Sequence, residues 1–228
     1  MTTTSTTPAV DLLRSRYSVR RFLPNPLTAE DIRGVLEDAQ TSPSNSNTQP
    51  WVVHVVSGGV RDAVSEAMLR AYEDDRPSPD FTAGYGDGPY AERAQRHGAT
   101  LYGALGVARS DVEGRRDVVR DNLRFYGAPH AAFLFMPLLG DGVRTAADIG
   151  MYAQTFLLSL TARGFHGIPQ TILGMYADAV REVLGVPSEL KLLFGISFGT
   201  ADPSAPVNDL RMHRLPIEDS VVLHDTPA

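Results

Sequence analysis

The sequence predicts a layered fold of the α/β or α+β class. Amphipathic segments with helical spacing alternate with short apolar runs along the chain, and no internal repeat or heptad pattern interrupts them. A length of 228 residues with 43% hydrophobic residues is typical of one globular domain with one sizeable core. We therefore expect a single domain over 8–228, preceded by a polar, flexible leader over 1–7.

The first half of the chain is predicted to hold three helices and one strand. Thr7 is expected to cap a helix that starts at Pro8, and Thr28 to cap a second helix with an acidic first turn. The remaining predictions are a strand over 51–57, a helix over about 61–73 and a flexible loop over 74–89 that is rich in Gly, Pro and Asp. We expect a lid at about 74–98.

The second half is predicted to alternate buried strands with helices. The expected elements are a strand over 131–137, a helix over 145–163 ended by Gly164, a helix over 177–184 closed by Gly185, a strand over 191–199 and a last strand-like run over 220–224. A polar tail from about 206 to 228 contains the last strand-like run. We expect this tail to pack on a partner subunit.

Composition excludes several classes of function. The chain has no cysteine, which rules out disulfides, thiolate metal sites and a Cys nucleophile, and is consistent with a reducing cytoplasm. A net charge of -6 argues against a nucleic-acid partner. The apolar runs are too short to span a bilayer, so we expect no membrane association. The six histidines lack metal-ligand spacing, and no metal site is predicted.

Two basic clusters lie near opposite ends of the chain. In an extended segment, Arg16, Ser18 and Arg20 share one face and present two guanidinium groups and a hydroxyl. Such donors suit a phosphate or an electron-rich ring edge. A second cluster contains Arg211, His213 and Arg214. If the fold brings both clusters together, they form a discrete anion site in an acidic protein.

A polar loop precedes the only Trp of the chain. The stretch SPSNSNTQPW, residues 42–51, supplies six side chains over 44–49 that can donate and accept hydrogen bonds. An ordinary turn uses one or two such residues, so their density favours a ligand with many polar atoms.

The sequence GISFG over 195–199 matches the motif of the nucleophile elbow of hydrolases. An elbow requires a helix directly after the serine, and the Pro-rich segment that follows Ser197 disfavours one. We therefore reject the hydrolase interpretation.

Taken together, the arginine motif of 16–22 (RYSVRRF) and the loop SPSNSNTQPW strongly resemble the FMN-dependent nitroreductase family. The stretches GAPH at 127–130, DIGMYAQ at 148–154, GFHGIPQ at 164–170 and RLP at 214–216 extend the resemblance over nearly the whole chain. The resemblance implies an α+β fold with a mixed sheet flanked by helices. It also implies an intertwined homodimer with two FMN sites at the subunit interface.

The resemblance assigns roles to individual residues. Arg16 and Arg214 hold the FMN phosphate, Arg20 faces the pyrimidine edge of the ring, and the Gln170 backbone N–H points at the reactive N5 atom. The implied cofactor-binding set is Arg16, Tyr17, Ser18, Arg20, Pro43, Ser44, Asn45, Asn47, Asn122, Asp148, Pro169, Gln170, Arg211 and Arg214. Arg20 and Gln170 are the expected catalytic residues. The loop residues of this set are expected to reach the flavin of the partner.

The implied activity is reduction of nitroaromatic or quinone-like acceptors with NADPH or NADH as hydride donor. Aromatic residues that we expect to line the acceptor pocket are Tyr85, Tyr90, Tyr102, Phe125 and Tyr126. The family commonly has a basic residue where this chain has Met212, and Arg211 is expected to replace it. Two alternatives stay open: a flavin-dependent oxidase or dehydrogenase of a biosynthetic pathway, and a flavin-binding protein without turnover.

Overall fold

The structure is a computed structural model that describes residues 8–82 and 84–225. The predicted leader and its Thr7 cap lie outside this range. The helices are α1 (Ala9–Ser15), α2 (Ala29–Ala39), α3 (Gly58–Glu73), α4 (Pro89–Ala104), α5 (Val112–Leu123), α6 (Val143–Ala162) and α7 (Ala177–Leu184). The strands are β1 (Val52–Ser57), β2 (His130–Pro137), β3 (His166–Gln170) and β4 (Leu190–Gly199). Short 3₁₀ turns are η1 (Asn45–Asn47), η2 (Phe125–Gly127), η3 (Thr171–Met175), η4 (Pro206–Asp209) and η5 (Ile217–Asp219).

The four strands form one sheet in the order β1-β2-β4-β3. All three strand pairings are antiparallel. The family resemblance had led us to expect a mixed sheet instead. A parallel bridge between Ser18 and Gly167 adds the N-terminal segment to the edge strand β3. The predicted α+β class is confirmed.

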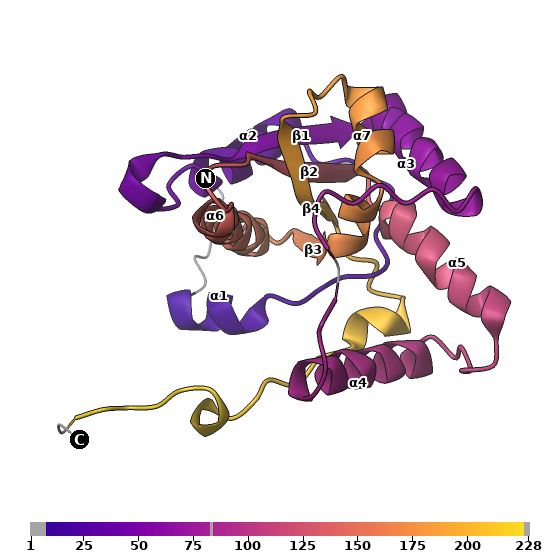
Figure 1. Ribbon diagram of the computed structural model, residues 1–228. Coiled ribbons are helices and arrows are strands. Elements are labelled where there is room, and N and C mark those ends of the chain that lie inside the picture. The colour runs from indigo at the N-terminus through magenta and orange to yellow at the C-terminus, as the bar shows by residue number, and fades with distance from the viewer. Residues whose placement is uncertain (1–7, 83, 226–228) are drawn as a thin grey trace, which may run out of the picture.

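Helices cover both faces of the sheet, and β2 shows why. Its side chains alternate between two cores: Ala131, Phe133 and Phe135 pack with α3, α5 and α7. Ala132, Leu134 and Met136 pack on the other face with α2 and α6. In Figure 1, α3 and α5 lie on one side of the sheet and α6 on the other. A strand buried on both faces requires a continuous apolar run, as the sequence HAAFLFMP provides.

Local sequence explains the helix ends. Thr28 accepts the Asp31 backbone N–H at 3.1 Å, and the Asp31 carboxylate accepts the Thr28 N–H at 3.3 Å, so the predicted cap is a complete capping box. Gly185 follows α7 with a φ of 65°, the left-handed conformation expected of a helix stop.

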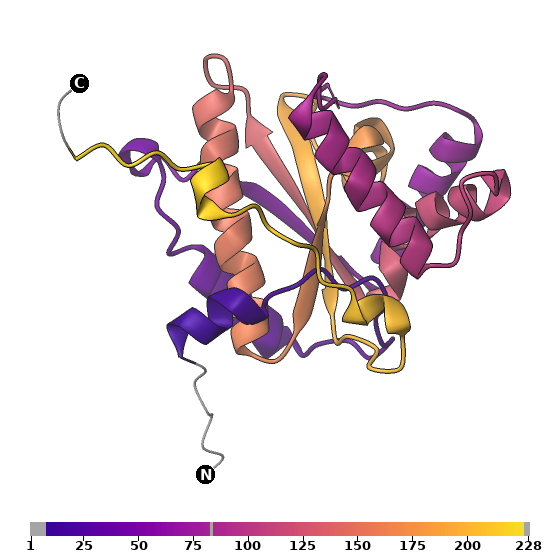
Figure 2. The ribbon, with the colours of Figure 1, turned by 90° about the horizontal axis from the view of Figure 1, so that it is seen from below.

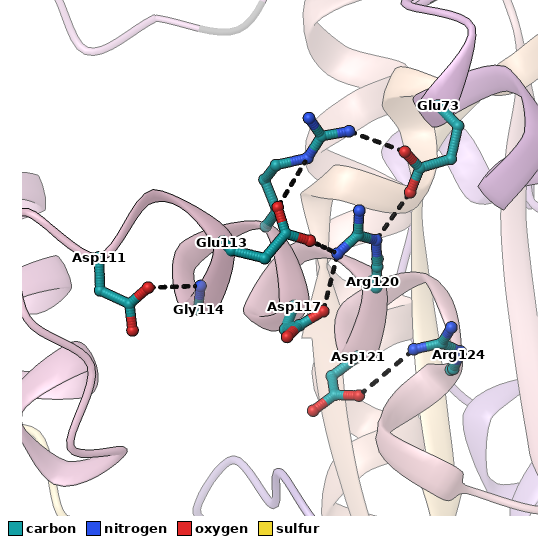
Figure 3. A network of polar contacts seen from close by, with 9 residues as sticks. Glu73, Asp111, Glu113, Gly114, Asp117, Arg120, Asp121 and Arg124 are labelled. Carbon is teal, nitrogen blue, oxygen red and sulfur yellow. Dashed lines mark hydrogen bonds and ion pairs between the residues drawn. The ribbon is translucent and has the colours of Figure 1, made fainter.

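Charged side chains join α3 to α5 (Figure 3). Glu73 of α3 accepts from Arg116 and Arg120 of α5, each at 2.7 Å. Arg120 also pairs with Asp117 at 2.8 Å and with Glu113. This network connects a helix with few apolar residues to the body of the protein.

The segment expected to be a flexible loop and lid divides into two parts. Its first part is anchored, because Ser78 donates its N–H to Met175 O at 2.8 Å and the Asp80 carboxylate pairs with Arg181. The second part runs into α4, which starts at Pro89 and was not predicted as a helix. The role of 74–98 as a lid remains a prediction.

The predicted strand over 220–224 is wrong. Residues 221–225 have no regular structure, and Val222 and Leu223 are 76% and 87% exposed. Within the described part of the chain no strand lies beside them to pair with. Figure 2 shows the C-terminal segment running away from the sheet past α6.

Candidate functional site

A cavity of about 910 Å³ lies beside the edge strand β3. The bridge from Ser18 to Gly167 sets the N-terminal arginine segment along this edge. The cavity is lined by Leu13, Arg14, Arg16, Tyr17, Ser18, Arg20, His97, Gln154, Leu157, Pro169, Leu210, Arg211, Met212 and Arg214. The structure thus brings the two predicted basic clusters together.

Asn208 joins the segments that carry these clusters. Its side-chain Oδ1 accepts the Arg20 backbone N–H at 2.9 Å, and its Nδ2 donates to Arg21 O at 2.8 Å and to Asp202 O at 2.9 Å. Asn208 is buried, and its three hydrogen bonds are partly shielded from water. Residues almost 190 positions apart are therefore held in a defined register.

The cavity is strongly positive. Its lining contains five arginines and His97, and among the described residues no Asp or Glu contributes to it. Burial, and secondly the nearby Arg214, lower the pKa of Arg16. Two guanidinium groups that repel each other are stabilised by an anion between them.

Arg211 is held by an aromatic ring. Its guanidinium carbon lies 3.5 Å from the centroid of the Tyr17 ring, and its Nη1 donates to Asn208 O at 2.7 Å. Stacking of this kind fixes a long, exposed side chain in one orientation. Tyr17 therefore has a positioning role as well as a place in the cavity wall.

Arg20 carries an unmet hydrogen-bonding group. Its Nη1 donates to Ser18 O at 3.3 Å, whereas its buried Nε has no partner within 8–82 and 84–225. Buried polar groups are almost always paired in native proteins, so an orphan donor on a residue of the cavity wall is consistent with an acceptor on a ligand. The lining fits a phosphate-bearing group with a second electron-rich edge, as FMN has.

Gln170 lies next to the cavity but points away from it. Its side chain is 4% exposed, donates to Asn122 O at 3.0 Å and to Asn122 Oδ1 at 3.3 Å, and accepts from Ser197 Oγ. Only its neighbour Pro169 lines the cavity. Ser197 is fully buried within β4, which agrees with the rejection of a nucleophile elbow.

The Ser/Asn loop is not part of this cavity. Pro43, Ser44, Asn45 and Asn47 are absent from its lining. Asp148, which was expected to touch the flavin, is 4% exposed and instead accepts the Asn45 N–H on its two oxygens at 3.1 and 3.2 Å. Ser46, Asn47 and Gln49 have positive φ values of 51°, 55° and 48°. Such conformations in non-glycine residues cluster at ligand clamps.

Several lining residues were not predicted. His97 was interpreted as structural, yet it lies in the cavity wall, where burial and the charge of Arg20 lower its pKa. Arg14, Gln154 and Leu157 also belong to the wall. Two sequence signals existed: Arg14 precedes the arginine motif by two positions, and Gln154 ends the stretch DIGMYAQ that resembles the family.

The aromatic residues that were expected in the acceptor pocket do not line one common cavity. Phe125 is fully buried and Tyr126 is 7% exposed. Tyr85 and Tyr102 line a separate cavity of about 750 Å³ along α4, and Tyr90 lines neither cavity.

Among the described residues, no group of three His, Asp or Glu side chains is arranged to hold a metal. None of the described helices is long and apolar enough to cross a membrane.

The fold is a helix-flanked antiparallel sheet with an arginine-lined cavity at its edge, and this lining suits a phosphate-bearing ligand. The chain belongs to the nitroreductase family, whose family model matches residues 13–200. It is 44% identical over 227 residues to nitroreductase NfnB of Mycolicibacterium smegmatis, with 96% of each chain covered. It is 34% identical to a 4-nitrobenzoate reductase of Pseudomonas putida, with 89% of each covered.

A solved structure agrees with these sequence relatives. The FMN-dependent nitroreductase NfnB from Mycobacterium smegmatis, in complex with NADPH, superposes with a TM-score of 0.91. The superposition covers 95% of this chain and 97% of that structure, at 44% identity. The resemblance inferred from the motifs is confirmed.

Proposed function

We propose that this protein is an FMN-dependent nitroreductase that uses NADPH or NADH to reduce nitroaromatic or quinone-like acceptors. Membership of the nitroreductase family and the FMN and NADPH named for its structural relative support this function. The observation that carries it is the cavity itself, whose wall contains four arginines besides Arg20, and the Arg20 Nε is buried without a partner among the described residues.

Within this proposal, Arg16 and Arg214 hold the FMN phosphate. Burial first, and the charge of Arg214 second, lower the pKa of Arg16, and a dianion bound between the two guanidinium groups would offset both effects. Arg211, stacked on Tyr17, adds a third donor, and the Ser18 hydroxyl completes the set. Each well-formed charge-assisted bond contributes about 1.5 to 3 kcal/mol.

FMN, when bound, would supply the redox chemistry of a ping-pong reaction, that is, hydride transfer from the nicotinamide and reduction of the acceptor. Arg20, in the cavity wall, would place its positive charge beside the pyrimidine edge, where negative charge accumulates on reduction. Pro169, which lines the cavity, would contact the flavin ring, and the backbone N–H of Gln170 would serve its N5 atom. The side-chain bonds of Gln170 to Asn122 and Ser197 keep this strand end rigid.

We further propose a homodimer in which the Ser/Asn loop of one protomer completes the cavity of its partner. The loop is held in a strained shape by Asp148, lies outside the cavity of its own chain, and has Asn45, Ser46 and Asn47 exposed. The C-terminal tail exposes Leu215, Ile217, Val221, Val222 and Leu223, which is consistent with packing on another copy. Each protomer thus supplies what the other lacks.

The test is an absorbance spectrum of the purified protein with FMN, followed by anaerobic titration with NADPH and then NADH. We expect bound flavin to be bleached by a nicotinamide and to be reoxidised by 4-nitrobenzoate or a quinone. A protein that stays colourless with FMN present contradicts the proposal. Bleaching without reoxidation by any nitroarene, together with oxygen-coupled turnover of another compound, favours an oxidase instead.

A further inference from the structure

A second cavity, of about 750 Å³, lies along α4 and is lined by two of the tyrosines that were expected in the acceptor pocket. Tyr85 lies in the loop before α4, and Tyr102 lies in the last turn of that helix. Arg109, in the connection after α4, and Arg115, on α5, also belong to its wall. This space, the α4 cavity, thus gathers side chains from three successive segments.

The turn between α4 and α5 brings these side chains together. Helix α4 ends in a Schellman motif, in which Gly106 has a φ of 69° and Val107 donates its N–H to Tyr102 O at 2.9 Å. Asp111 then caps α5, because its side chain accepts the Gly114 N–H at 2.9 Å. The chain reverses within this short connection, so the start of α5 returns to the end of α4.

Both arginines of the α4 cavity lack an acidic partner. The guanidinium carbon of Arg115 lies 4.4 Å from the centroid of the Tyr102 ring. In the described part of the chain, no hydrogen bond or ion pair reaches the side chain of Arg115 or of Arg109, and no Asp or Glu lines this cavity. By contrast, the neighbouring Arg116 pairs with Glu73 at 2.7 Å. Two guanidinium groups without a counter-charge, one of them stacked on a ring, are suited to bind an anion.

Small residues leave room beside these side chains for a flat ring. The face of α4 that lines the cavity includes Ala94, Gly98 and Gly103. A Cβ atom added at Gly98 or Gly103 would meet no side chain and no backbone of another segment within 4 Å, so the space next to the helix is open. Aromatic rings stack favourably on other rings and on guanidinium groups. The α4 cavity therefore combines an aromatic surface with an anion-binding end.

The α4 cavity is separate from the cavity beside β3, and α4 forms part of the wall of both. His97 lines the cavity beside β3, whereas its neighbours Gln95 and Gly98 line the α4 cavity. The two linings have no residue in common. Five arginines in the cavity beside β3 suit a phosphate-bearing group, whereas two arginines and two tyrosines suit an aromatic ligand with a single charged group.

We propose that the α4 cavity binds small aromatic carboxylates, with the ring against Tyr85 and Tyr102 and the carboxylate on Arg109 and Arg115. This inference goes beyond the proposed function, because the site needs no flavin and lies outside the cavity beside β3. A carboxylate matches the planar fork of a guanidinium, and an aryl carboxylate carries this group directly on the ring. An uncharged nitroarene would make the ring contacts without the ion pair.

The test is an NMR titration of the FMN-loaded protein with 4-nitrobenzoate, followed on the backbone amides of Gly98 and Gly103. Without a nicotinamide the ligand is not turned over. We expect saturable shifts of both signals with a Kd of about 1 mM, as suits so small a ligand. Uncharged nitrobenzene and non-aromatic cyclohexanecarboxylate should each bind about tenfold more weakly, because each lacks one of the two kinds of contact.

Variants locate the ligand. Arg109→Gln and Arg115→Gln should each weaken 4-nitrobenzoate binding about tenfold, the equivalent of one charge-assisted bond. The matched control is Arg96→Gln, since Arg96 is also on α4 but is exposed, pairs with Glu92 at 3.7 Å and lines neither cavity. Gly98→Leu places a side chain in the open space without lowering helix propensity and should abolish binding. Gly98→Ala should largely retain it.

Three outcomes would overturn the inference: amides of Gly98 and Gly103 that do not shift, nitrobenzene that binds as tightly as 4-nitrobenzoate, or Arg115→Gln that binds as tightly as Arg96→Gln. The apoprotein should give the same shifts at both glycines. A protein that binds no FMN therefore refutes the proposed function and leaves this test intact, whereas a flavin-loaded protein without these shifts refutes the present inference alone.

Discussion

The backbone N–H of Asn45 is shared between the two carboxylate oxygens of Asp148, at 3.1 and 3.2 Å. Asp148 lies on α6, and the same face of this helix holds the start of the loop, since Ser42 Oγ donates to Thr155 Oγ1 at 2.8 Å. The spacing of Asp148 and Thr155, seven positions, places both on one side of the helix. Helix α6 is therefore the scaffold of the Ser/Asn loop.

Asp148→Ala should release this loop. We expect FMN affinity to fall about tenfold, since a buried charge-assisted bond that shapes the loop is lost. Asp148→Asn keeps one acceptor oxygen, so its FMN affinity should fall less than that of Asp148→Ala. Quenching of flavin fluorescence on titration measures both, with the exposed Glu189→Ala as control. Equal affinities for Asp148→Ala and the control would show that the loop does not depend on this carboxylate.

Arg16→Ala and Arg214→Ala should each weaken FMN binding by about 10- to 100-fold, the equivalent of one charge-assisted bond. Riboflavin lacks the phosphate, so its affinity should change little in the same variants. Exposed Arg33, paired with Glu37 on α2, is the matched control as Arg33→Ala. A parallel loss of riboflavin and FMN affinity would place these arginines elsewhere on the ligand.

Arg20→Ala should lower the rate of flavin reduction more than it lowers FMN affinity. In the proposed function, the charge of Arg20 acts where negative charge appears during the reaction, whereas Arg16 and Arg214 bind the phosphate. Stopped-flow reduction by NADPH, combined with FMN titration, separates the two effects. Equal decreases in the reduction rate and in FMN affinity would mean that Arg20 contributes only to FMN binding.

The free energy of unfolding should decrease at low pH, and protonation of His130 should account for part of this decrease. This buried imidazole accepts the Leu27 N–H on Nε2 at 2.9 Å and contacts Ser57 Oγ, and burial lowers its pKa. The unfolded chain then binds a proton more readily, so this contribution is complete above pH of about 6.5 and is lost as pH falls toward the lowered folded pKa.

Urea unfolding of the wild type and of His130→Gln at pH 7.5 and pH 5.5 measures this effect. The wild type should lose more of its unfolding free energy between the two pH values than the variant does. The same loss in both proteins would assign the pH dependence to the other histidines whose pKa is lowered by burial, His54, His97 and His166.

The strands and helices with strong apolar patterns were predictable, and those with weak patterns were not. Helix α4 buries only Leu101 and α5 only Val118 and Leu123, so neither shows a clear helical stripe. Strand β3 contains Gly167 and Pro169, residues that rarely occur inside strands, and was therefore interpreted as a turn. The run at 220–224 is apolar enough for a strand but has no pairing partner in the described chain.

The arginine cluster was predictable because alternation along an extended segment puts Arg16, Ser18 and Arg20 on one face. The meeting of this face with Arg211 and Arg214 depends on Asn208, whose role no local pattern reveals. The turn formed by residues 125–127 was equally hidden. It requires three left-handed residues in succession, which tertiary packing imposes against the local preference of two aromatic side chains.

The separation of the Ser/Asn loop from the cavity of its own chain has a genetic consequence. In the proposed homodimer, a mixed pair of an Arg16→Ala subunit and a subunit with a damaged loop contains one pocket with both lesions and one with neither. Two inactive alleles expressed in the same cell should then complement each other and restore up to half of the turnover per mixed pair. An enzyme whose pockets were built within single polypeptides would show no such rescue.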